Sequence, residues 1–93
     1  MSNKGTAVLN FGAFPGSNEA SAVISDTNIT SGVLLDAWIR AEATSDHTIQ
    51  DHTYAPCFIE ITVGVANAGV GFTIYARCTD LMVGTWNIDW VWA

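Results

Sequence analysis

The chain has 93 residues, of which 49% are hydrophobic and 13% are charged, and its formal net charge is −6. Only Lys4, Arg40 and Arg77 are basic, so the chain lacks the basic face that binds nucleic-acid phosphates or an anionic membrane. No stretch approaches the roughly 20 apolar residues of a transmembrane helix. The first residues also lack the continuous apolar run of a secretory signal, so we expect synthesis in the cytosol.

This length corresponds to a single domain, residues 1–93. The charged share of 13% is about half of the roughly 25% that is usual in soluble domains. A core of this size hides only a modest share of the chain's surface. We therefore expect part of the apolar surface to lie in a subunit interface of a homo-oligomer. The alternative is a monomer covered by Ser, Thr and Asn side chains.

Apolar and polar residues alternate along most of the chain. Residues 6–11 and 20–25 alternate with a period of two, and the Pro15-Gly16 pair between them indicates a turn. In residues 33–42 every odd position is apolar, which favours a strand over the amphipathic helix that the same segment also allows. Residues 57–65 and 71–78 flank an Ala-Asn-Ala-Gly connection that is typical of a hairpin.

With the last alternating segment, residues 85–92, the pattern predicts about six strands and no convincing helix. Short strands separated by turn-rich links are typical of all-β folds. We predict an antiparallel β-sandwich, jelly-roll-like or closed into a small barrel.

The last predicted strand carries the heaviest apolar side chains. Trp86, Ile88, Trp90 and Trp92 occupy alternate positions, so they share one face of the strand. Aromatic residues dominate both cores and interfaces, and we interpret this face as core or interface. The alternative is an exposed platform on which sugar rings stack.

The segment SDHTIQDHT repeats an Asp-His pair, Asp46-His47 and then Asp51-His52. Both residue types bind metals, but the spacing matches neither the HExxH motif nor a Cys/His finger. We interpret the segment as a solvated loop whose side chains cap backbone amides, and as a candidate contact with a partner. We predict no bound metal.

The sequence contains no signature of an enzyme. It has no nucleophile elbow around a serine, and its glycines form neither a dinucleotide fingerprint nor a phosphate loop. We therefore predict no catalytic residues and no cofactor. Cys57 and Cys78 are interpreted as two small buried residues with free thiols. If the hairpin turned at Asn67-Ala68, these two cysteines would face each other and a disulfide would be within reach.

Three stretches carry a further signal: GTAVLNFGAFPGSNEAS, DHTIQDH and GVGFTIYARCTDLMVGTWNIDWVWA. Together they resemble a group of small structural proteins encoded by tailed bacteriophages and prophages. The shared pattern begins with G-T-A-x-L-x-F-G-x-F-P-G and ends with G-T-W-x-V-x-W-V-W. Val70 departs from it, because that position is expected to hold a small polar residue.

The resemblance implies a non-enzymatic virion protein that is made in the host cytoplasm and contacts capsid or tail proteins. Its leading implication is decoration or stabilisation of the capsid. The alternative implication is a tail or fibre component that contacts the host surface or carbohydrate.

Overall fold

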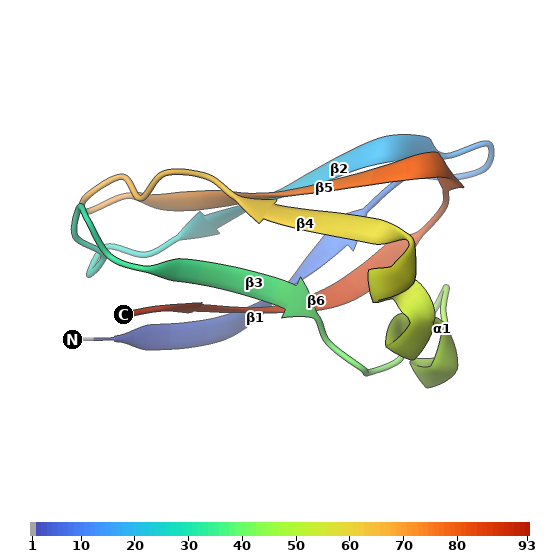
Figure 1. Ribbon diagram of the computed structural model, residues 1–93, viewed down its shortest axis with the longest axis horizontal. Helices are drawn as coiled ribbons and strands as arrows, with labels where there is room; N and C mark the ends of the chain where they lie inside the picture. The colour runs from blue at the N-terminus through green and yellow to red at the C-terminus, as the bar shows by residue number, and fades with distance from the viewer. Residues whose placement is uncertain (1) are drawn as a thin grey trace.

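A computed structural model, which describes residues 2–93, shows two three-stranded antiparallel sheets packed against each other (Figure 1). The strand order in the first sheet is β1 (Asn3–Asn10), β6 (Thr85–Trp92), β3 (Leu35–Ile39). The order in the second is β2 (Ser17–Ser25), β5 (Gly71–Met82), β4 (Ile59–Val63). The predicted all-β sandwich is confirmed. The barrel alternative is wrong, because no strand pairing within residues 2–93 joins the two sheets.

Each sheet has one central strand that pairs with both of the other strands. In the first sheet β6 lies between β1 and β3, and it pairs along its full length with β1, from Asn10 opposite Thr85 to Asn3 opposite Trp92. Neighbours on both sides hold this strand in place, although it is the last of the chain. In the second sheet β5 has the same central position, between β2 and β4.

The core lies between the sheets and is built from alternate residues of the strands, as their period of two predicts. The buried apolar residues are Leu9, Phe11, Ile24, Ile29, Ala37, Ile39, Ala55, Ile59, Phe72, Ile74, Ala76, Trp86, Ile88, Trp90 and Trp92. The opposite side chains of each strand face outward, so both sheets present a polar outer face with a few exposed apolar residues.

The prediction that the chain contains no helix is wrong within the Asp/His segment. Here α1 (Ile49–Tyr54) is followed by the short 3₁₀ helix η1 (Ala55–Cys57). A capping box begins α1: the backbone N–H of Asp51 donates to Thr48 Oγ1, and the N–H of Thr48 donates to the Asp51 carboxylate. Six residues are too few for helical periodicity to reveal such an element. Neither helix of the described chain is long and apolar enough to cross a membrane.

The two cysteines do not face each other. The β4–β5 register places Cys78 opposite Ile59, and Cys57 lies before β4 in η1. Both thiols are free, but Cys57 is exposed and Cys78 is only partly buried. The cysteines do not face each other because the hairpin turns further along the chain than Asn67-Ala68. The prediction of two buried cysteines is wrong, because Cys57 lies in η1 outside the sheet and Cys78 is only partly covered.

Candidate interaction surfaces

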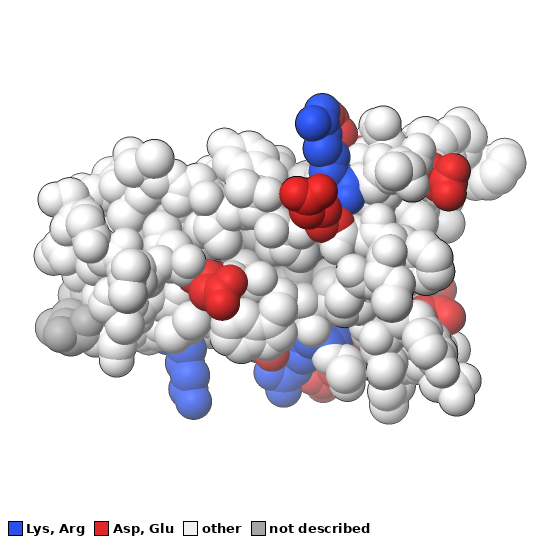
Figure 2. All heavy atoms as spheres, in the orientation of Figure 1, with Lys and Arg blue, Asp and Glu red and all other residues white. Residues whose placement is uncertain are grey.

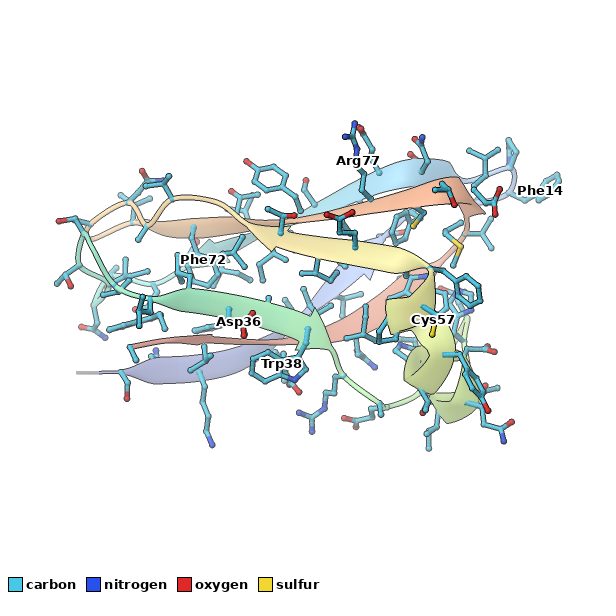
Figure 3. The ribbon with its side chains drawn as sticks, in the orientation of Figure 1. Phe14, Asp36, Trp38, Cys57, Phe72 and Arg77 are labelled. Atoms are coloured by element: carbon cyan, nitrogen blue, oxygen red, sulfur yellow. The ribbon has the colours of Figure 1, made fainter. Side chains whose placement is uncertain are left out.

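The aromatic face of β6 lies in the core of a single chain. The exposed fractions of Trp86, Ile88, Trp90 and Trp92 are 3%, 0%, 8% and 1%. The ring of Trp90 meets that of Phe72 edge to face, at a centroid distance of 5.4 Å, and Figure 3 shows Phe72 between the two sheets. This strand therefore offers no exposed stacking platform, and that alternative is wrong for these three tryptophans.

One of these tryptophans also anchors a loop. Nε1 of Trp92 donates to the Asp26 carboxylate at 2.7 Å. Asn3 Nδ2 donates to the same carboxylate at 2.9 Å, and the backbone N–H of Asn28 donates to it at 3.0 Å. The bond from Trp92 is the main cause that lowers the pKa of Asp26 below its ordinary value, with the other two adding to it. The sequence signals only the local part of this site, an Asp-Thr-Asn turn.

The first Asp-His pair docks its segment onto the start of β6. The Asp46 carboxylate accepts hydrogen bonds from Thr85, at 2.9 Å from the backbone N–H and at 2.7 Å from the hydroxyl. These two bonds lower the pKa of Asp46. The His47 ring stacks on Trp86 at a centroid distance of 3.7 Å, and its Nε2 lies 2.6 Å from the carbonyl oxygen of Val83.

The second pair belongs to α1, and its histidine is 1% exposed. His52 Nε2 accepts a hydrogen bond from the backbone N–H of Asn87 at 2.9 Å. Its proton must therefore lie on Nδ1, which donates to the carbonyl oxygen of Thr48 at 2.9 Å. The ring has to be neutral for this arrangement, because a protonated imidazole has no acceptor nitrogen.

The Asp/His segment thus joins α1 to β6 through side-chain hydrogen bonds. Its aspartates cap backbone amides, as the sequence suggested, but the expected solvated loop is wrong for the buried His52. The two histidine rings come together against Trp86, with their centroids 6.3 Å apart. No group of three or more His, Cys, Asp or Glu side chains suited to a metal ion occurs within residues 2–93.

Five of the large exposed apolar side chains lie at the end of the sandwich that carries α1, whereas Leu34, Val65 and Val70 are exposed in the connections before β3 and between β4 and β5. Figure 1 shows α1, the β1–β2 connection and the β5–β6 connection at this end, and Figure 3 shows Phe14 extending from it. We call this surface the apolar end. Its large exposed side chains are Phe14, Ile49, Tyr54, Phe58 and Leu81.

Charges are sparse on the rest of the surface, and uncharged residues form most of the face in Figure 2. Arg77 pairs with Glu19 at 2.8 Å on the outer face of the β2-β5-β4 sheet. Arg40 pairs with Asp89 at 2.8 Å and with Glu42 on the outer face of the β1-β6-β3 sheet. Arg77 also lines a surface hollow that contains Phe58, so one of the three cations borders the apolar end.

The outer face of the β1-β6-β3 sheet carries an exposed tryptophan, Trp38, that is not among the site residues predicted from the sequence. Trp38 is 44% exposed, and Figure 3 shows its ring outside the sandwich. The alternation of residues 33–42 places it on the outward face, but only strand pairing reveals its neighbours.

No protein-family model, no curated protein and no solved structure matches the chain.

Proposed function

We propose that the chain is a non-enzymatic structural protein of a tailed-bacteriophage particle that acts through protein–protein contacts. Decoration or stabilisation of the capsid is its leading placement. The observation that carries the proposal is the apolar end, whose residues would contact a shell protein or a second copy of the chain.

Burial and exposure support this role for the apolar end. The exposed fraction is 90% for Phe14, 64% for both Tyr54 and Phe58, and 60% for Leu81. Large apolar side chains that gather on the surface of a small domain mark interaction sites. Aromatic residues are enriched at such interfaces, and charged residues are depleted at their centres.

The hydrogen bonds of the Asp/His segment also support a structural role. It holds the residues that are most suited to catalysis or metal binding, and the bonds described above use them to join α1 to β6. The sequence resemblance to small phage structural proteins points to the same class. The partners are then capsid or tail proteins, together with other copies of this chain.

Add-back of purified protein to particles tests the proposal. Phage particles that lack the protein are mixed with the recombinant chain, sedimented, and labelled with gold-conjugated antibody for electron microscopy. We expect gold over the heads. The variant Phe14→Ser/Phe58→Ser should not sediment with the particles, whereas Val23→Ser, which changes a 77% exposed residue of β2, should bind like the unaltered chain.

The outcomes separate the two placements. Gold at the tail would exclude capsid decoration and support the second candidate, a tail or fibre component. The exposed ring of Trp38 favours this second candidate, since it suits contact with carbohydrate on a host surface. Absence of gold from the whole particle would contradict both placements.

A further inference from the structure

A hollow of about 460 Å³ lies on the outer face of the β1-β6-β3 sheet. Its lining residues include Lys4, Thr6, Trp38, Arg40, Asp89 and Val91. Two of the three cations of this acidic chain therefore lie beside its most exposed tryptophan.

The strand register places the side chains that line this hollow on three neighbouring strands with β6 in the middle, and we call the hollow the trough. Asp89 lies opposite Thr6 of β1 on one side and opposite Trp38 of β3 on the other. Neighbouring strands are about 4.8 Å apart, so the side chains of β1 and β3 stand roughly 10 Å apart across the trough. Asp89 of β6 stands between these side chains, so a ligand in the trough would lie over Asp89.

Trp38 of β3 supplies a flat apolar side chain at one side of the trough. It is 44% exposed, whereas Trp86, Trp90 and Trp92 are at most 8% exposed. The electron-rich face of an indole attracts positively polarised hydrogens. The C–H groups on one face of a pyranose ring are such hydrogens, so a sugar ring can stack on this side chain.

The ion pair beside Trp38 supplies fixed polar groups. Arg40 Nη1 donates to Asp89 Oδ1 at 2.8 Å, and Arg40 Nε donates to Glu42. These bonds hold the guanidinium in place, and they leave further N–H groups of Arg40 and lone pairs of Asp89 to bind other groups. A donor beside an acceptor matches a pair of neighbouring sugar hydroxyls, each of which both donates and accepts.

The charges around the trough argue against an anionic ligand. Lys4 and Arg40 are accompanied by Asp36, Glu42 and Asp89, so two cations face three anions on this outer face. Binding of phosphate or nucleic acid requires an excess of positive charge. An uncharged ligand that is rich in hydroxyl groups can bind without an excess of positive charge on the protein.

We propose that this trough binds a neutral oligosaccharide, with Trp38 stacked on a sugar ring and the Arg40–Asp89 pair bonded to its hydroxyls. The inference deepens the second candidate of the proposed function, contact with carbohydrate, and its test is separate from that of the virion placement because sugar binding is measured on the isolated chain.

The opposite sheet provides a matched control. A hollow of about 540 Å³ there contains Tyr75 and the Arg77–Glu19 pair. Its ion pair is far more exposed, with side chains 74% and 60% accessible, whereas Arg40 and Asp89 are 44% and 22% accessible. Its groups are thus held less firmly, and we expect Tyr75→Ala to leave sugar binding unchanged.

The test uses the fluorescence of Trp38, the one tryptophan in the chain that is open to solvent. The protein is first applied to an array of neutral and acidic glycans, and the strongest neutral oligosaccharide is then titrated while acrylamide quenching is recorded. We expect the sugar to protect Trp38 from the quencher. Trp38→Ala should weaken binding by roughly tenfold or more, the change that about 1.4 kcal/mol produces.

Conservative variants separate recognition from folding. Trp38→Tyr should retain part of the affinity because it keeps a ring, and Asp89→Asn should lose affinity while its far-UV circular dichroism stays that of the unaltered chain. The proposal is overturned if no neutral glycan on the array binds, if only acidic glycans bind, or if Trp38→Ala binds normally. Loss of binding in Tyr75→Ala but not in Trp38→Ala would place the site on the other sheet and also overturn it.

Discussion

His52 and Asn87 are joined by a 2.9 Å hydrogen bond in which the backbone N–H of Asn87 donates to Nε2 of the buried imidazole. A central strand of a sheet normally bonds only to neighbouring strands. Here β6 extends beyond the end of β3, and α1 supplies the missing acceptor through a side chain. The histidine thus completes the hydrogen bonding of the sheet.

Replacement of His52 by Ala should therefore destabilise the whole domain. The partly buried Asn87 N–H would lose its acceptor, which costs up to about 1–3 kcal/mol, and loss of the packing of the buried ring would add to this. The free energy of unfolding is measured by urea denaturation. Gln50→Ala, which changes an exposed residue of the same helix, should alter it by less than about 0.5 kcal/mol. Equal stability of the two variants would show that the bond from Asn87 contributes nothing.

The Asp26–Trp92 bond predicts a loss of stability in acid. The folded state lowers the pKa of Asp26 below its ordinary value of 3.8. The unfolded chain therefore takes up the proton first, so the stabilising effect is complete above pH 3.8 and disappears as pH falls through the folded pKa. Asp26→Asn should be less stable than the unaltered chain at pH 7, and this difference should shrink on acidification.

The variant Trp92→Phe isolates the indole N–H as the cause. Removal of that donor should raise the pKa of Asp26 towards its ordinary value, as an NMR titration of the carboxyl carbon would record. An unchanged titration curve would mean that Asn3 and Asn28 alone hold the carboxylate.

Gly5 is required by its contact with the ring of Trp90. A Cβ atom at position 5 would lie 2.6 Å from Cζ2 of that indole, so Gly5→Ala should cost about 1–3 kcal/mol through overpacking. At Gly64 the nearest atom to an added Cβ is Cε2 of the exposed Tyr75, at 3.2 Å. Gly64→Ala should cost less, since this ring can move into solvent. Thermal unfolding of the two variants compares them, and the reverse order would contradict the packing of Trp90.

Trp90→Ala tests whether the aromatic face of β6 is core. Loss of a buried tryptophan costs about 3–5 kcal/mol, enough to unfold much of so small a domain. Sedimentation equilibrium of the unaltered chain and of Trp90→Phe, which keeps a ring, gives the second readout. Both should have the same oligomeric state. A folded but less associated Trp90→Phe would show that this face is an interface.

The alternation of side chains predicted the core side of several strands, although Ala41, on the predicted apolar face of its segment, is exposed beyond the end of β3. Leu9, Ile24, Ile39 and Trp90 are buried, and each belongs to the predicted apolar face of its strand. The reason is local: successive side chains of any strand point to opposite sides. Sequence alone also indicated that the aspartates of the Asp/His segment would cap backbone amides.

Only the tertiary structure decided which strands are neighbours and which polar groups meet. Thr6, Trp38 and Asp89 are far apart in the chain, and they form one trough because β6 lies between β1 and β3. His52 stands in a polar sequence, yet it is buried because α1 docks on β6. Such relationships depend on pairing between distant segments, whereas the period of two in a sequence reports only the geometry of each strand by itself.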